Sequence, residues 1–416
     1  LMLVVVRIGT QLPVPGVNGS YFSEWFSGNS GSAFGFFDAI TGGSFEKMSV
    51  FALNITPYIT SSIIIQLLTI AIPKLEELQK DGEEGRKKMT AITRYLTVAL
   101  ALMESLAMAI GFGRSGLLIK FNALNVITAV VTLTAGSTVI MWIGERITEN
   151  GVGNGISIVL TINIISRIPQ DLTLLFEQFV KGKEIAFQVL NLAIIIAIII
   201  VVTVLTVALQ GAERRIPVQY SRKVQGRKQV GGQTSHIPLK VNTAGVFPII
   251  FAQSLFMFPL IIMQLLGKSG GNGIGGTILK MLNQSNWCDF NEPIYSIGLI
   301  VYIALVIAFA YFYTSITFNP LEIADNMKKQ GGFIPGIRPG KPTSEYLTKI
   351  LNYIIFIGAV GLVIVAVIPI FFEGAFNASI SFGGTSLIII VGVIIETLKQ
   401  IESRMLVRNY KGFLND

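Results

Sequence analysis

The sequence predicts an all-α, polytopic membrane protein, and three observations carry that prediction. Only 13% of the 416 residues are charged, against roughly 25% in soluble domains. Hydrophobic residues make up 51% of the chain. Residues 190–209 are apolar except for Asn191, Thr203 and Thr206, and about 20 apolar residues span a bilayer as a helix.

Apolar runs of this kind predict ten spans. The first is truncated here and ends near Leu12, and the others cover 51–73, 95–112, 122–146, 154–169, 189–210, 244–266, 293–317, 346–372 and 383–403. The run before Leu12 is not followed by a small-residue cleavage site, so we interpret it as part of a span and not as a signal peptide.

The basic residues predict the orientation of these spans. Of the 32 Lys and Arg residues, 23 fall on the side of the loop that follows the second span, eight fall on the other side, and Arg7 lies in the first span. Cytoplasmic loops carry such an excess. The bias therefore places both chain ends in the cytoplasm, and it explains the net charge of +8 without a nucleic-acid partner.

Two of the predicted cytoplasmic loops are long. Residues 213–243 carry seven basic residues and one acidic residue, Glu213. Residues 319–345 contain a Gly- and Pro-rich tip at 331–342, which disfavours regular structure there. Long ordered loops tend to be functional, and the alternative is that both are simply solvated connections.

On the opposite side, residues 13–50 are too polar and Gly-rich to span. Their second half, 34–50, places Phe36, Phe37, Ile40 and Phe45 around Gly42 and Gly43. This pattern predicts a short, loosely held helix that re-enters the membrane from outside. Irregular backbone at that depth must be buried in protein or line a water-filled cavity.

Several chemistries are excluded by the sequence. Cys288 and His236 are the only cysteine and histidine, so an intrachain disulfide is impossible and a His/Cys metal site is not expected. The chain contains no Walker A sequence, and the GNGIGG string at 271–276 does not follow a predicted strand as a dinucleotide fingerprint would. We expect no cofactor and no enzymatic activity.

Ionisable residues inside predicted spans are few. Arg7 and Glu104 are the clear examples, and such residues are usually functional because they are costly in lipid. Glu104 is either a satisfied hydrogen-bond partner between helices or part of a polar seam that opens. A secondary transporter for a small solute would need more coupling carboxylates; a structural assembly factor without a pore is a third interpretation.

Six strings then resemble the SecY family. They are RIGTQLPVPG at 7–16, PYITSSIIIQLL at 57–68, TENGVGNGIS at 148–157, SHIPLKVN at 235–242, FIPGIRPG at 333–340 and FGGTSLI from Phe382. They occur in the family's order and extend over the whole chain. A single string would be weak support, whereas six in order identify the chain as a member of this family.

The resemblance implies a protein-conducting channel with a clam-like fold. Its two halves, 1–170 with spans 1–5 and 171–416 with spans 6–10, would be related by inverted pseudo-symmetry. The family's aliphatic pore ring corresponds to Ile59, Ile63, Leu160, Ile164, Ile250 and Ile389. Without the resemblance, these would be ordinary core or lipid-facing residues. A ring of this kind blocks ions by dewetting.

The resemblance also implies a plug at about 37–50, including Phe37, Ile40, Gly42, Gly43 and Phe45. A lateral gate lies between spans 2 and 3 and spans 7 and 8, and the candidates for its polar contacts are Gln66, Glu104 and Gln253.

Docking positions for a motor or ribosome correspond to Arg227, Lys228 and Arg338. The implied partners are SecE, SecG, the SecA ATPase, the ribosome, signal peptides, translocating polypeptides and membrane lipid. The implied location is the bacterial cytoplasmic membrane.

Overall fold

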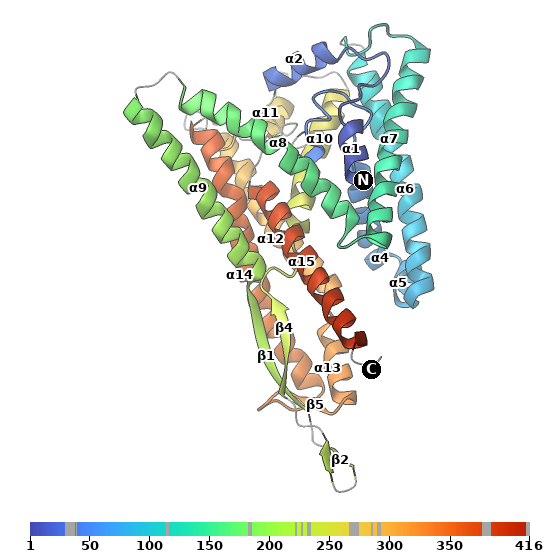
Figure 1. Ribbon diagram of the computed structural model, residues 1–416, viewed down its shortest axis with the longest axis vertical. Helices are drawn as coiled ribbons and strands as arrows, with labels where there is room; N and C mark the ends of the chain where they lie inside the picture. Colours follow the sequence, from blue (N-terminus) through green and yellow to red (C-terminus); the bar gives the residue numbers. More distant parts are fainter. Residues whose placement is uncertain are drawn as a thin grey trace.

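The computed structural model describes residues 1–29, 38, 40–113, 116–181, 185–220, 223–225, 228–230, 234–265, 274–283, 286–288, 293–376 and 384–412. Within these residues the chain is mainly helical, with long helices running between the two ends of the molecule in Figure 1. The predicted α-helical, polytopic fold is confirmed.

The first group of helices precedes residue 180. It consists of α1 (Met2–Gly9), α2 (Gly19–Asn29), α4 (Thr56–Ala71), α5 (Pro73–Lys80), α6 (Gly82–Gly111), α7 (Ala123–Asn150) and α8 (Gly155–Phe179). Helix α4 has Pro57 in its first turn, where proline is pre-organised for a helix. It ends before Pro73 because Ile72 adopts an extended conformation, as residues that precede proline prefer.

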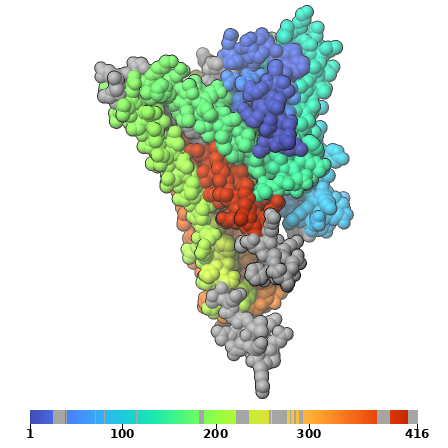
Figure 2. Space-filling model, in the orientation of Figure 1, coloured from blue at the N-terminus to red at the C-terminus, as the bar shows by residue number. Residues whose placement is uncertain are grey.

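The second group contains α9 (Ile185–Gly211), α10 (Phe247–Leu265), α11 (Ile274–Leu282), η3 (Pro293–Ser296), α12 (Ile297–Thr317), α13 (Pro320–Lys329), α14 (Lys341–Phe376) and α15 (Gly384–Gly412). Helix α9 runs along the outer edge of the molecule in Figure 2. Many of its large apolar side chains are exposed, among them Phe187, Leu190 and Ile200, as expected for a helix that faces lipid.

Six helical segments within the described residues are long and apolar enough to cross a membrane, or seven if α4 and α5 form one bent span. The six lie at Gly82–Gly111, Ala123–Asn150, Gly155–Phe179, Phe187–Gly211, Pro293–Lys329 and Lys341–Phe371. The remaining predicted spans coincide with α1, α10 and α15. Of these, α1 has only eight residues, fewer than half of those a span needs.

Helix α8 corrects the prediction for the fifth span. The expected segment, 154–169, is shorter than the observed helix, Gly155–Phe179, which continues through Pro169 for ten more residues. The side chain of Asn154 begins the helix by accepting hydrogen bonds from the backbone N–H groups of Ile156 at 3.1 Å and Ser157 at 3.4 Å, which is the usual role of an N-cap asparagine.

The two long loops predicted to face the cytoplasm also contain more regular structure than predicted. Strands β1 (Glu213–Tyr220) and β4 (Thr234–Lys240) pair antiparallel, and β5 (Gly332–Phe333) pairs with β1. A second, smaller hairpin joins β2 (Lys223–Gln225) to β3 (Lys228–Val230). The Gly- and Pro-rich loop begins with α13, and the loop predicted at 74–94 is helical in α5 and the start of α6.

Each group of helices has its own apolar interior. The first is centred on Phe22, Phe45, Leu53, Leu117 and Leu133. Gly136 of α7 allows a close approach there, because a Cβ at this position would lie 2.0 Å from the carbonyl oxygen of Val50.

The interior of the second group surrounds Trp287, whose indole Nε1–H donates to the carbonyl oxygen of Met281 at 2.7 Å. A third cluster joins the sheet to α13 and α14 through Ile216, Val218, Leu239, Met327 and Leu347. The two groups of helices meet where α10 contacts α6 and where α15 and α9 contact α8.

Candidate functional site

An apolar cluster lies where the two groups of helices meet. Ile164 of α8, Ile250 of α10 and Ile389 of α15 are buried in it, and Ile59 and Ile63 of α4 pack against them. These side chains come from both groups of helices, although 330 residues separate Ile59 from Ile389. The structure therefore brings together five of the six residues predicted to form a ring.

The sixth residue, Leu160, belongs to the adjoining cluster. There it is buried with Ile40 and Val159, and Ile59 packs against this cluster as well. Ile59 thus links the two clusters, and Leu160 lies one helical turn from Ile164 on α8. All six predicted residues form a continuous apolar region.

Aromatic side chains border this region, and the sequence analysis did not identify them. Phe251 of α10 packs edge-on against Phe309 of α12 at 5.6 Å between ring centroids, and Phe247 stacks on Tyr313 at 4.9 Å. Both pairs hold α10 against α12. The spacing of four residues in Phe247/Phe251 and Phe309/Tyr313 is a signal that these rings share helix faces.

Residues 40–55, which precede α4, pack against this apolar region. Ile40 and Phe45 are buried, while Phe37 lies outside the described residues. The segment is held by hydrogen bonds, and this corrects the prediction of a loosely held helix. Ser44 Oγ donates to the carbonyl oxygens of Thr41 at 2.8 Å and Phe51 at 3.0 Å, and Asn54 Nδ2 donates to that of Ile40 at 3.3 Å.

Gly42 and Gly43 set how closely this segment approaches α8. Both have positive φ, at +69° and +80°, in the left-handed region that glycine adopts without strain. A Cβ on Gly42 would lie 2.8 Å from the carbonyl oxygen of Asn163. Only a glycine fits at this contact.

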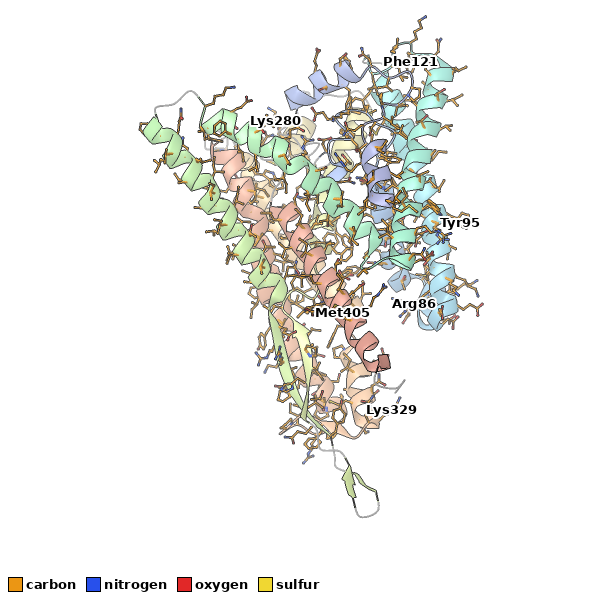
Figure 3. The ribbon with its side chains drawn as sticks, in the orientation of Figure 1. Arg86, Tyr95, Phe121, Lys280, Lys329 and Met405 are labelled. Carbon is orange, nitrogen blue, oxygen red and sulfur yellow. The ribbon has the colours of Figure 1, made fainter. Side chains whose placement is uncertain are left out.

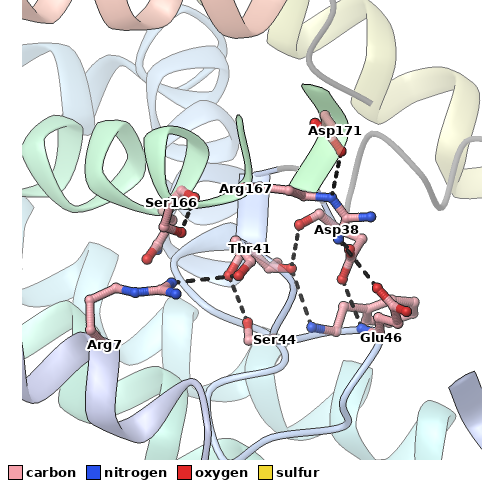
Figure 4. Close-up of polar contacts among 11 residues, drawn as sticks. Arg7, Asp38, Thr41, Ser44, Glu46, Ser166, Arg167 and Asp171 are labelled. Carbon is pink, nitrogen blue, oxygen red and sulfur yellow. Dashed lines mark hydrogen bonds and ion pairs between the residues drawn. The ribbon is translucent and has the colours of Figure 1, made fainter. Parts of the chain in front are cut away.

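A buried ionic group joins the segment to α8. The guanidinium of Arg167 contacts the carboxylate of Asp38, with Glu46 Oε2 at 3.5 Å from Nη1 and Asp171 Oδ1 at 3.5 Å from Nε. Figure 4 shows Arg167 reaching toward these acids, with Arg7 approaching the segment from the other side. The Arg7 Nη1–H donates to the carbonyl oxygen of Gly42 at 3.5 Å.

The position of Arg167 is a correction, because this residue is one of the eight Lys and Arg residues that the charge count assigned to the loops on the side opposite the basic loops. Its side chain is only 7% exposed and lies within α8. Asp171, one helical turn further along α8, could have indicated that Arg167 is buried, because buried charges are paired. Burial raises the pKa of the Glu46 carboxyl, while Lys47 and a hydrogen bond with Ser23 lower it.

The three residues predicted to form polar contacts at a lateral gate do not meet. Gln66 of α4 and Glu104 of α6 are half-buried, and Gln253 of α10 is buried. Among the described residues, no hydrogen bond or ion pair joins any two of them, and Gln253 Oε1 is buried without a partner. The hydroxyl contacts of α6 lie within the first group of helices instead: Ser61 of α4 to Thr97 of α6 at 2.6 Å, and Ser105 of α6 to Thr134 of α7 at 2.9 Å.

Two of the three predicted docking residues, Lys228 and Arg338, fall within the described residues, in or beside the strands β3 and β5. Arg338 is exposed between Gly336 and Gly340, and its carbonyl oxygen accepts a hydrogen bond from Thr343 Oγ1 at 2.8 Å. Ile334, which is buried in the cluster beneath the sheet, anchors this tip. Lys228 belongs to β3, and Arg227 lies outside the described residues.

Solved structures with this arrangement are translocation channels. One is a SecY structure, described as showing that the plug domain stabilises the closed state of the translocation channel and maintains a membrane seal. That structure aligns with this chain with a TM-score of 0.64 at 19% identity, over 97% of this chain and 90% of the SecY chain. Sec61 in the canine ribosome–channel complex from the endoplasmic reticulum aligns with a TM-score of 0.62 at 18% identity, with the same coverage of 97% and 90%. The fold is that of a polypeptide-conducting membrane channel.

The chain belongs to the SecY family. The SecY family model matches residues 49–398. The protein translocase subunit SecY of Streptomyces scabiei is 44% identical over 429 residues, which cover 99% of this chain and 94% of that protein. The chain is therefore a multi-pass membrane protein that serves as the channel subunit of a protein translocase, and it is not an enzyme.

Proposed function

We propose that Ile59, Ile63, Leu160, Ile164, Ile250 and Ile389 form the resting seal of the channel. The observation that carries this proposal is the continuous apolar region that they build from four helices of both groups. A narrow apolar constriction excludes water and ions. Aliphatic side chains also have no hydrogen-bonding preference, so they can line the path of an unfolded chain of any sequence.

In this proposal the segment at about 37–50 is the plug. The two predicted halves, 1–170 and 171–416, correspond to the two groups of helices with the boundary moved to the end of α8, and they part to open the channel. The parting line runs between α6 and α10, whose contact joins the two groups on one side. A hydrophobic signal peptide that enters there gains contact with lipid and shifts the equilibrium toward the open state. Hydrophobic segments leave into the membrane by the same route.

The proposed partners bind the end of the molecule that carries the basic loops. In Figure 3 both Arg86 and Lys329 lie below Phe121 and Lys280, with Lys329 near the end that carries the sheet. We assign that end to the cytoplasm, together with both termini, in a bacterial cytoplasmic membrane. The SecA motor or a ribosome docks there on Arg227, Lys228 and Arg338, SecE clamps the two halves, and SecG lies beside them.

Replacing Ile63 and Ile250 together by Asn tests the seal. A buried amide without a partner costs roughly 1–3 kcal/mol, so water enters the constriction and the resting ion conductance rises. The measurement is the current through the purified channel in planar bilayers without a signal peptide. Ile63→Leu with Ile250→Leu is the control, because it keeps the apolar character. A double Asn variant as tight as the parent would refute the assignment of the seal.

A further inference from the structure

The ionic group around Arg167 differs from the other ion pairs within the described residues. The others are at least partly exposed, and several join residues three or four apart on one helix, such as Lys87 to Glu83 and Lys88 to Glu84. Arg167 and Asp38 have side chains that are 7% and 0% exposed. Charges buried to this extent are costly, and they persist only where they are paired.

The group joins two parts of the chain that are far apart in sequence. Glu46 and Arg167 are 121 residues apart, and Asp38 and Glu46 both belong to the proposed plug. The Asp38 carboxylate also accepts a hydrogen bond from the backbone N–H of Glu46 at 2.7 Å. Asp38 therefore joins two parts of the proposed plug, and it also binds Arg167.

Asp171 supplies the orientation of Arg167. It contacts the Nε side of the guanidinium from the next turn of α8, while Nη1 faces Asp38 and Glu46. A planar guanidinium can bind carboxylates on two of its edges at once. Asp171 thus orients the Arg167 guanidinium on α8, so that it contacts Asp38 and Glu46 of the proposed plug.

We propose that Arg167 is a positioning residue that fastens the plug to α8 in the closed channel and so sets the threshold for opening. This inference rests on the function proposed above for the segment at 37–50. Displacement of the plug breaks the contacts of Arg167 with Asp38 and Glu46 and leaves the guanidinium paired with Asp171. The plug remains in place until a signal peptide or a translocating chain offsets that loss.

The test measures the plug and the seal separately, in the complete translocase reconstituted in liposomes. Arg167→Met keeps the length of the side chain and removes its charge. We expect hydrogen exchange of the backbone amides at 43–50 to become about tenfold faster, because contacts with a charged group have been lost. The resting ion flux should also rise. Arg167→Lys keeps the positive charge, so its exchange rate and ion flux should lie between those of Arg167→Met and the parent.

Lys181→Met is the matched control. It also removes one positive charge, from the exposed pair with Glu177 near the end of α8, and it should leave exchange and flux at the parent's values. Asp38→Asn alone should resemble Arg167→Met, and combining the two should add little, because both remove the same contact. If Arg167→Met fails to fold, Glu46→Gln provides the milder variant for the same measurements.

Exchange at 43–50 that stays at the parent's rate in folded Arg167→Met, or in Glu46→Gln if the former does not fold, would overturn the proposal. Faster exchange with an unchanged ion flux would support the fastening but refute the sealing role of the plug. The two proposals therefore fail in distinguishable ways.

Discussion

Gly42 brings the backbone of the plug against the backbone of α8, with no side chain between them. The neighbouring glycine, Gly43, has nearly the same backbone conformation but more space, since its nearest atom to an added Cβ is Arg167 Nη1 at 3.6 Å. Gly42 and Gly43 therefore have similar backbone conformations but different surroundings. Comparing substitutions at the two positions separates the effect of the close contact with α8 from the effect of the left-handed backbone.

Gly42→Ala should displace the plug more than Gly43→Ala does. Both substitutions place a non-glycine residue in the left-handed region, at a cost of roughly 1–2 kcal/mol. Gly42→Ala additionally forces its Cβ to within 2.8 Å of the Asn163 carbonyl oxygen, so the segment must move. The resting ion current of the two variants in planar bilayers checks this. Equal currents would mean that the close approach to α8 does not matter for sealing.

The candidate site was predictable only in part, and the reason differs between residues. Ile164 and Ile389 could be assigned because family motifs fix their positions, although isoleucines are common throughout the chain. Arg167 could not, since it stands next to Ile168 and Pro169, where an ending helix and a loop were equally consistent with the local sequence. Its burial depends on Asp38, which no local pattern connects with it.

At the level of elements, the strands are the largest departure from expectation. In β1 the side chains of Ile216 and Val218 are buried while Arg214, Arg215 and Pro217 are exposed, and this alternation is the mark of a strand with one buried face. The signal was present at 213–220, but it was short and was obscured by the basic residues around it. The long apolar helices were predictable because their signal extends over 20 residues or more.

The loop from α13 to α14 presents Arg338 on a rigid base. Asn319 begins α13 by accepting hydrogen bonds from the N–H groups of Leu321 and Glu322 at 3.2 and 3.4 Å, and Ile334 is buried beneath the sheet. The exposed tip therefore extends from an ordered support. This arrangement fixes the backbone at Arg338, which suits the docking role proposed above.

Arg338→Glu should lower motor-driven export at least about tenfold while the protein still folds and inserts. A reversed charge at a docking contact costs several kcal/mol, and each 1.4 kcal/mol is tenfold in affinity. Lys349→Glu is the control, because it makes the same charge change at an exposed site on α14. The measurement is ATP-dependent translocation of a secretory protein into vesicles. Export at the parent's rate would show that this loop is not the docking site.

On the scale of the whole molecule, two loops that the charge count assigns to one side of the membrane lie together. The sheet and α13 share one end, and α2 and α11 lie toward the other in Figure 1. The charge count predicted that these loops share a side, because it depends on composition and on the order of the spans, and the assignment of that side to the cytoplasm stays a prediction. Apart from the predicted ring residues, the contacts between the two groups of helices were not predictable, since each involves side chains from distant parts of the chain.

Single cysteines at Gln79, Gln225 and Gln330 should resist an impermeant thiol reagent that is added outside intact cells. These positions lie in α5, in β2 and after α13, and all are assigned to the cytoplasm. The background is Cys288→Ser, which removes the single cysteine of the sequence. Full labelling after the membrane has been permeabilised is the control for Gln79 and Gln330, which are exposed. Labelling of any one position from outside would contradict the assigned orientation.

The ionic group around Arg167 lies entirely on the α8 side of the interface between the two groups of helices. In the channel proposed above, a hinge motion between the groups carries the plug along with α8 and leaves its contacts with Arg167 intact. In that proposal, sideways opening toward lipid and axial opening toward the far compartment are two separate steps with separate energetic thresholds. A channel of this kind would release a hydrophobic helix into the bilayer while its axial path stays closed to ions, which would preserve the ion gradients of the cell during membrane-protein insertion.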